Sequence, residues 1–249
     1  MNFLKFRFPG IDSVGCAFGT RLGGVSRGAF YAGNISLEVG DDPEKVLENR
    51  KQAEKELGFN RLIELRQVHG SDIMFEAEQD NIYGTMPEGD GAVVSSPGAA
   101  AMIKTADCQP IFLAHESGKY VCALHVGWRG NMDNFPEKAV RKFCVYYNIR
   151  PGDVLAVRGP SLGPCCAAFD VFEDQWSGDF FSYYQEKSRT MDLWSLTRDQ
   201  LRGTGIQNNN LYSVDLCTKC RDDLFFSYRR KKKCGRQGNF IFLRGGQSG

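Results

Sequence analysis

Short runs of hydrophobic residues, separated by polar and glycine-rich segments, predict a series of strands and helices along this chain. The clearest helix begins at Asp42-Pro43, where an Asp cap precedes a proline at the first helical position, and ends at Gly58. One face of this helix is formed by residues spaced three or four positions apart, namely Val46, Arg50, Ala53 and Leu57. Because this face should meet the core, the guanidinium of Arg50 needs an anionic partner, a cavity or a route to solvent.

Other hydrophobic runs along the chain predict further strands and helices. Strands are expected at residues 91–94, 120–126 and 153–157, where apolar runs end at Gly, Pro or Ser. Helices are expected at 135–147 and 170–184, although the second segment is rich in aromatic residues. The mixture predicts a sheet with helices packed on it and leaves open whether the sheet is parallel or mixed. With no repeat or linker along the sequence, we expect a single domain over residues 1–249.

Composition narrows the classes of function. The chain has 249 residues, of which 42% are hydrophobic and 24% charged, so it can bury a full core. Lys and Arg number 31 against 30 for Asp and Glu, which leaves no global field to gather nucleic acid or a membrane surface. The N-terminus lacks the apolar stretch of a secretory signal. We therefore expect a cytoplasmic protein that acts on a small molecule, without nucleic acid or membrane partners.

Nine cysteines, an odd number, indicate free thiols or metal ligands and not a disulfide framework. Cys217 and Cys220 form a CxxC pair, and no second CxxC exists to complete a four-cysteine site. We interpret this pair as structural and the neighbours Cys165 and Cys166 as packed thiols. The basic run 229–233 is interpreted as a solvated turn.

Two of the three histidines, His69 and His125, lie at the ends of apolar runs, and Cys108 lies between them where the chain must turn. Two imidazoles and a thiolate suit zinc and leave a fourth position for water or substrate. Three simpler alternatives stay open at this point. The histidines could be ordinary core or surface residues, Cys108 a small buried hydrophobe, or Cys108 a nucleophile activated by a histidine. The remaining histidine, His115, fits an exposed turn and is given no role.

Several longer motifs follow one another along nearly the whole chain. They are Gly23-Gly24-Val25-Ser26, Gly40-Asp41-Asp42-Pro43, Glu48-Asn49-Arg50, Gln67-Val68-His69-Gly70, Thr105-Ala106-Asp107-Cys108, His125-Val126-Gly127-Trp128-Arg129-Gly130, Gly159-Pro160-Ser161-Leu162-Gly163-Pro164-Cys165-Cys166, Phe225-Phe226-Ser227-Tyr228-Arg229-Arg230 and Gly235-Arg236-Gln237. In this order they resemble the YfiH family, also named for polyphenol oxidase or laccase domains and for peptidoglycan editing. The resemblance implies an α+β fold, a mixed α/β sandwich of a single YfiH-like domain in which helices pack on a mixed sheet.

The resemblance also implies roles for particular residues. It makes His69, Cys108 and His125 the ligands of a catalytic zinc ion, and it makes Asn34 and Arg50 substrate-facing groups. A planar guanidinium on a core-facing stripe would suit phosphate or another oxyanion. The chain departs from the family pattern at Ala167-Ala168, where an aromatic and an acidic residue are usual, and at Val126, where Ala is usual.

The implied function is zinc-dependent phosphorolysis of adenosine, inosine or guanosine, with methylthioadenosine cleavage and adenosine deamination as further reactions of the site. Purine nucleoside and phosphate would then be the small-molecule partners, and the protein would be a monomer or a homodimer. Rival functions are a metal-free cysteine hydrolase or amidase using Cys108 and His125, and a factor that edits peptidoglycan precursors. A copper phenol oxidase is disfavoured because three histidines cannot supply several copper centres.

Overall fold

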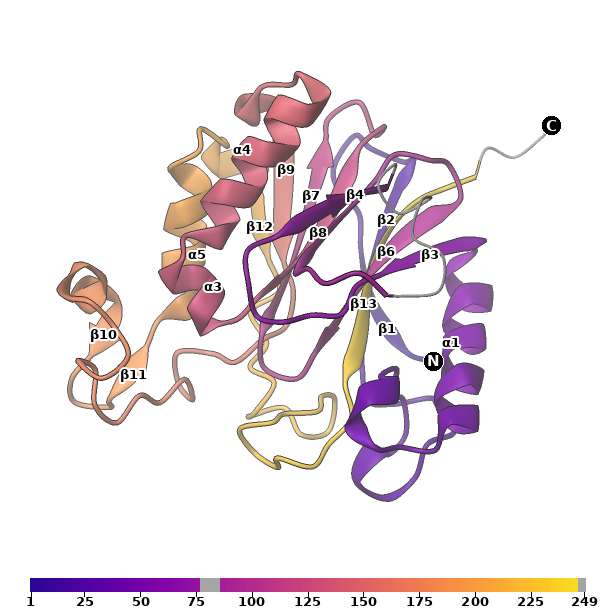
Figure 1. The fold of residues 1–249 in the computed structure, drawn as a ribbon, viewed down its shortest axis with the longest axis horizontal. Coiled ribbons are helices and arrows are strands. Elements are labelled where there is room, and N and C mark those ends of the chain that lie inside the picture. Colours follow the sequence, from indigo (N-terminus) through magenta and orange to yellow (C-terminus); the bar gives the residue numbers. More distant parts are fainter. Residues whose placement is uncertain (77–85, 246–249) are drawn as a thin grey trace.

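Two β-sheets stacked face to face form the centre of the molecule, and helices cover both outer faces (Figure 1). This arrangement is seen in a computed structural model, which describes residues 1–76 and 86–245. Within those ranges, no helix is both long and apolar enough to cross a membrane. The α+β sandwich expected from the sequence is confirmed, and both large sheets are mixed.

The first sheet has five strands, in the order β1 (Phe3–Phe6), β2 (Val14–Gly19), β13 (Gln237–Leu243), β6 (Ala99–Thr105) and β3 (Arg61–Glu64). The second has six, in the order β12 (Leu211–Ser213), β9 (Val154–Arg158), β7 (Gln109–His115), β8 (Val121–Val126), β5 (Gly91–Val94) and β4 (Ile73–Phe75). Three pairs are parallel, namely β3–β6, β4–β5 and β9–β12, and the other pairs in these sheets are antiparallel. A separate small hairpin joins β10 (Tyr184–Gln185) to β11 (Thr190–Met191).

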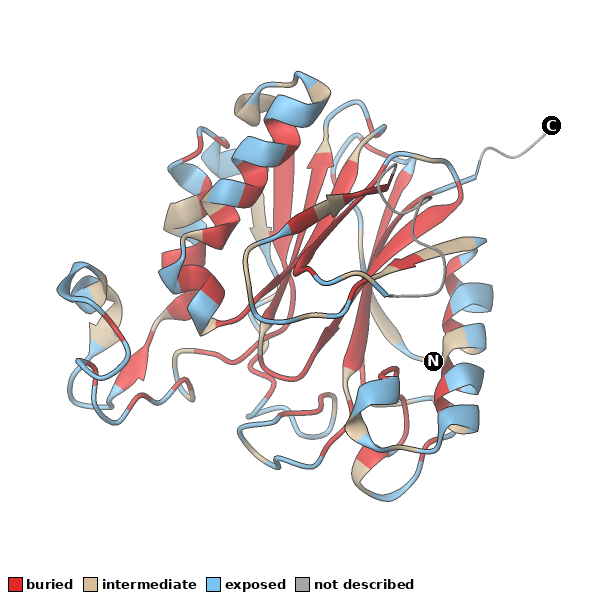
Figure 2. Cartoon of the chain, viewed as in Figure 1, coloured by how far each residue is buried: buried red, intermediate tan, exposed pale blue. Residues whose placement is uncertain are grey.

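The strands read as continuous apolar runs because each large sheet is covered on both faces. In β6, Ala101 and Ile103 face the opposite sheet while Ala100 and Met102 face outward, and all four are buried. Burial colours in Figure 2 show the same pattern, with red strands at the centre and pale blue on the outer helix faces.

The helices close the two outer faces. Helix α1 (Pro43–Leu57) covers the first sheet, begins at the Asp42 cap and ends at Gly58, whose φ of 76° is left-handed. Helices α4 (Phe135–Tyr147) and α5 (Leu193–Arg202) cover the second sheet (Figure 1). A short helix, α3 (Trp128–Met132), follows β8 directly.

The predicted strands at 91–94, 120–126 and 153–157 and the predicted helix at 135–147 are confirmed within one residue. The helix predicted at 170–184 is wrong. That segment forms turns and one 3-10 helix, Gly178–Tyr183, because its large rings pack into a local cluster with Trp128 instead of forming a regular stripe. Short 3-10 turns also occur at Gly28–Phe30, Leu37–Val39, Pro151–Asp153 and Asn208–Asn210.

The contact that joins the two sheets can be tested with Phe18→Ala. The ring of Phe18 stacks on Phe112 of the other sheet, with ring centroids 4.9 Å apart, and neither side chain is exposed. Truncation should lower the free energy of unfolding by about 3–5 kcal/mol, measured by urea denaturation. Val145→Ala, at a side chain that is 81% exposed, is the control and should change it by less than about 0.5 kcal/mol.

Candidate metal centre and substrate cavity

Three connections at one end of the sandwich bring His69, Cys108 and His125 together. His69 lies between β3 and β4, Cys108 occupies the turn from β6 to β7, and His125 lies near the end of β8. The turn at Cys108 carries the chain from one sheet to the other, so its position depends on the packing of both.

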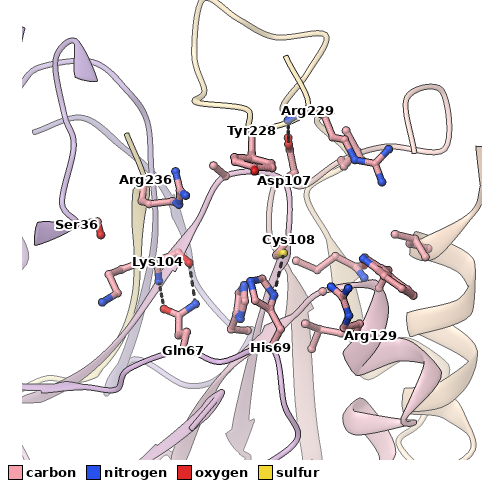
Figure 3. A pocket seen from close by; sticks show the side chains of 18 of the residues that line it. Ser36, Gln67, His69, Lys104, Asp107, Cys108, Arg129, Tyr228, Arg229 and Arg236 are labelled. Atoms are coloured by element: carbon pink, nitrogen blue, oxygen red, sulfur yellow. Dashed lines mark hydrogen bonds between the residues drawn. The ribbon is translucent and has the colours of Figure 1, made fainter. Parts of the chain in front are cut away.

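The three side chains are close enough to share one ion. One nitrogen of each imidazole and the Cys108 sulfur all lie within 4.8 Å of one another. The sulfur is 4.0 Å from Nδ1 of His69, and the two imidazole rings have centroids 4.7 Å apart. Figure 3 shows the Cys108 sulfur above the ring of His69 in the middle of the cavity. This set can hold a metal through three protein ligands and leave a coordination position open. His115, by contrast, ends β7 and pairs with Ser117.

A buried carboxylate, Asp90, orients both histidine segments. Its Oδ1 accepts a hydrogen bond from His125 Nδ1 at 2.7 Å and another from the backbone N–H of His69 at 3.1 Å. Its Oδ2 accepts from the backbone N–H groups of Val68 and Gly70. Since Nδ1 of His125 donates to this carboxylate, Nε2 is left as the coordinating nitrogen.

The charges of the cluster follow from these contacts. Burial disfavours the thiolate of Cys108, but the two histidines outweigh it and lower the pKa of the thiol to about 6. Burial likewise disfavours protonated His125, but Cys108 and Asp90 outweigh it and raise the pKa of the imidazole to about 9. Burial also opposes ionisation of Asp90, yet His125 and backbone N–H groups hold the pKa of this carboxyl below its ordinary value. Without a metal, these contacts favour the thiolate of Cys108 and the protonated form of His125.

Gly127 leaves room for these ligands. A Cβ at this position would lie 3.1 Å from His69 Nδ1 and 3.2 Å from the Cys108 sulfur, which is tighter than ordinary contact. The glycine after the His125 strand therefore serves close approach of the backbone to the ligand cluster, and its φ of −84° needs no special freedom.

The ligand cluster opens into a cavity of about 530 Å³. Aromatic residues form one part of its wall, where Trp128 and Phe169 meet edge to face with centroids 5.8 Å apart. On the other side of Cys108 and His69, Ser36, Lys104 and Arg236 present polar groups (Figure 3). A cavity with one aromatic side, one cationic side and a ligand cluster between them suits a flat, polar organic molecule with an anion.

Asn34 and Arg50 do not appear on this wall among the described residues. Asn34 is fully buried, and its Oδ1 accepts from the backbone N–H groups of Ser36 and Arg236, both of which line the cavity. The structure thus gives Asn34 a positioning role, and direct contact between this side chain and a substrate stays a prediction.

Arg50 is paired with an anionic residue, as its core-facing position requires. Its guanidinium forms two hydrogen bonds to Glu64, at 2.7 and 2.9 Å, and a third to the carbonyl of Ile35. Glu64 also accepts from Lys104 Nζ at 2.7 Å, so Arg50 is linked through Glu64 to a residue of the cavity wall. Direct contact between Arg50 and a substrate stays a prediction. Burial opposes ionisation of Glu64, but Arg50 and Lys104 outweigh it and hold its pKa below the ordinary value.

The structure adds a contact between the CxxC pair and the neighbouring cysteines Cys165 and Cys166 that the sequence interpretation did not include. Cys165 and Cys166 do complete a four-cysteine cluster with Cys217 and Cys220, although no second CxxC is present. Sequence reasoning looked for a repeated CxxC, whereas adjacent cysteines on a distant loop supply the other two sulfurs. Asp90 was also missed, because a single Asp before a short strand carries no local signal of its partner.

Comparisons with known proteins identify relatives that match nearly the whole chain. The curated relatives include the purine nucleoside phosphorylase YfiH of Shigella flexneri, 31% identical over 95% of this chain and 97% of that protein. They also include the purine nucleoside phosphorylase YlmD of Geobacillus stearothermophilus, 32% identical over 96% of this chain and 94% of that protein.

Solved structures show the same fold. The crystal structure of YlmD from Geobacillus stearothermophilus matches with a TM-score of 0.89 and 30% identity, covering 98% of this chain and 97% of that one. A Neisseria meningitidis protein matches with a TM-score of 0.86 and 29% identity, covering 98% and 100%. The family model described as multi-copper polyphenol oxidoreductase laccase matches residues 15–244. The chain therefore belongs to this family, the YfiH family that its motifs resemble.

Proposed function

We propose that this protein is a zinc-dependent purine nucleoside phosphorylase. One observation carries the proposal: an incomplete ligand set of two imidazoles and one thiolate lies inside a cavity with an aromatic side and a cationic side. The names of the relatives from Shigella and Geobacillus support the same reaction. The substrates would be adenosine, inosine or guanosine together with phosphate, and the products a free base and ribose 1-phosphate.

The donor set fits zinc. Neutral imidazole and thiolate are both zinc ligands, and three protein ligands are typical of catalytic zinc sites. When bound, zinc supplies a Lewis acid that polarises or orients a reacting group. The ligand residues His69, Cys108 and His125 hold it in place, and Asp90 fixes the tautomer of His125.

The aromatic side of the cavity would bind the purine. Trp128 and Phe169 offer ring faces and edges, and stacking of a base on an aromatic ring is worth about 1–3 kcal/mol. The guanidinium of Arg129 lies 4.3 Å from the Trp128 ring and adds a donor at that side. These groups would place the base so that the sugar lies toward the ligand cluster.

The other side would bind phosphate. Arg236 donates hydrogen bonds from one terminal nitrogen to the backbone carbonyls of Cys234 and Gly235. It forms no ion pair with any carboxylate among the described residues. Ser36 lies on the same side of the cavity (Figure 3). Lys104 lies there too, but Glu38 and Glu64 already neutralise its charge. Arg236 is therefore the cation best placed to hold phosphate beside the anomeric carbon.

The proposal is tested first by zinc removal and phosphate omission. Zinc-loaded protein should release free base from inosine only when phosphate is present, and a chelator should abolish the release until zinc is restored. The readout is chromatography of base and ribose 1-phosphate. Ammonia release from adenosine without phosphate would instead indicate a deaminase, and full activity in metal-free protein would favour the cysteine hydrolase.

Replacement of the orienting carboxylate, Asp90→Asn, should weaken zinc binding without removing a ligand. Loss of the charged partner of His125 is expected to reduce zinc affinity by about 10–100-fold, since such outer partners set ligand orientation and basicity. Competition with a chromogenic chelator measures this. Asp133→Asn, at a surface ion pair, is the control, and equal affinity in both variants would contradict the role assigned to Asp90.

Steady-state kinetics can distinguish the roles of the two sides of the cavity. Arg236→Gln should raise the KM for phosphate by about 10- to 150-fold, because a charge-assisted contact contributes about 1.5–3 kcal/mol, and should leave the KM for inosine nearly unchanged. Trp128→Leu should raise the KM for inosine and spare that for phosphate. Arg141→Gln on the outer surface of α4 is the control for loss of a cation. The opposite pattern would reverse the assignment of the two sides.

A further inference from the structure

A second cluster of potential metal ligands lies outside the substrate cavity. Cys165 and Cys166 come from the segment after β9, and Cys217 and Cys220 from the segment after β12. None of the four is among the residues that line the cavity. All four are free thiols, and two of them, Cys165 and Cys220, are exposed. Exposed free thiols are chemically vulnerable, so a cluster of four cysteines that includes two exposed thiols calls for an explanation.

The sulfur positions match one shared ion. All four sulfurs lie within 4.8 Å of one another. The sulfur of Cys220 is nearly equidistant from those of Cys165 and Cys166, at 3.6 and 3.5 Å. A tetrahedral zinc ion with Zn–S bonds of about 2.3 Å separates its sulfurs by about 3.8 Å. Two disulfides would instead draw the sulfurs into pairs about 2.05 Å apart, and the observed cluster is not paired in that way.

We propose that Cys165, Cys166, Cys217 and Cys220 bind a structural zinc ion, distinct from the ion at Cys108. Four thiolates fill the tetrahedral shell and leave no position for substrate, which is the pattern of a structural site. Binding replaces the thiol protons with the ion and involves no oxidation.

The surrounding groups fit such an ion. The backbone N–H of Gly163 donates to the Cys217 sulfur at 3.3 Å, as outer hydrogen bonds to ligand sulfurs do. Arg230 donates to the carbonyls of Thr218 and Lys219 and so holds the CxxC turn in shape. Four thiolates and one zinc ion carry a net charge of −2. The guanidinium of Arg230, which donates to carbonyls of the CxxC turn, is a cation close to that charge.

The site would also brace the catalytic centre. Thr218, inside the CxxC turn, donates from Oγ1 to Asp107 Oδ1 at 2.7 Å. From the other cysteine segment, the backbone N–H of Leu162 donates to the carbonyl of Asp107 at 2.8 Å. Asp107 precedes the ligand Cys108 and has a strained φ of 100°, so both cysteine segments hold the residue that sets the ligand in place.

Zinc content per chain tests the proposal. Protein prepared under reducing conditions, loaded with zinc chloride and dialysed against metal-free buffer, should contain two zinc ions per chain by mass spectrometry. The double variant Cys217→Ser, Cys220→Ser should contain one, Cys108→Ala should also contain one, and the three changes together should contain none. Cys144→Ala, at a buried cysteine on α4 outside both clusters, is the matched control and should keep two.

Cobalt binding gives a second measurement that does not depend on the folding of the double variant. In Cys108→Ala the catalytic cluster has no sulfur left, so any thiolate-to-cobalt charge-transfer band must come from the four-cysteine cluster. We expect one cobalt ion per chain, with that band and the visible absorption of tetrahedral cobalt. Absence of the band in folded Cys108→Ala would overturn the proposal, as would a double variant that contains as much zinc as the wild type. Disulfides that persist in the reduced preparation would overturn it as well.

Discussion

Burial of both faces of both sheets is the constraint on which the rest of this structure depends. The inner faces meet through side chains such as Phe18 and Phe112, and the outer faces are closed by α1 on one side and by α4 and α5 on the other. Strand register cannot shift without exposing apolar side chains, so the ends of β6, β7 and β8 are held in place. The ligands at Cys108 and His125 take their positions from those ends.

The pairing of buried charges is the second feature that organises this structure. Asp90 is matched by His125 and by backbone N–H groups, and Glu64 is matched by Arg50 and Lys104. Each carboxylate stays ionised in spite of burial because its partners outweigh the cost of desolvation. These pairs hold the groups next to the cavity. A change at a residue such as Arg50, which does not itself line the cavity, would therefore still alter the position of groups on its wall.

Asp107 connects the two cysteine-containing clusters. Its backbone and carboxylate are held by Leu162, Thr218 and the backbone N–H of Arg229, and Cys108 follows it directly. In the proposed arrangement, one zinc ion fixes the loops that hold Asp107 and the other takes part in chemistry. The proposed division between a closed structural site and an open catalytic site would account for four sulfurs in one cluster and three candidate ligands in the other.

The sequence alone determined the features that depend on near neighbours. Helix α1 was predicted from its Asp42 cap, its apolar spacing and Gly58, since capping and periodicity are local effects. The order of motifs indicated the family and the three residues that meet in the first cluster. The tertiary structure alone decided what depends on contacts between distant segments: the pairing of Arg50 with Glu64, the place of Asp90 beneath His125, and the meeting of Cys165 and Cys166 with the CxxC pair. It also decided that residues 170–184 form no α-helix, because contacts of their aromatic rings with other segments overrode the local pattern. Such contacts join residues tens of positions apart, and no local spacing encodes them.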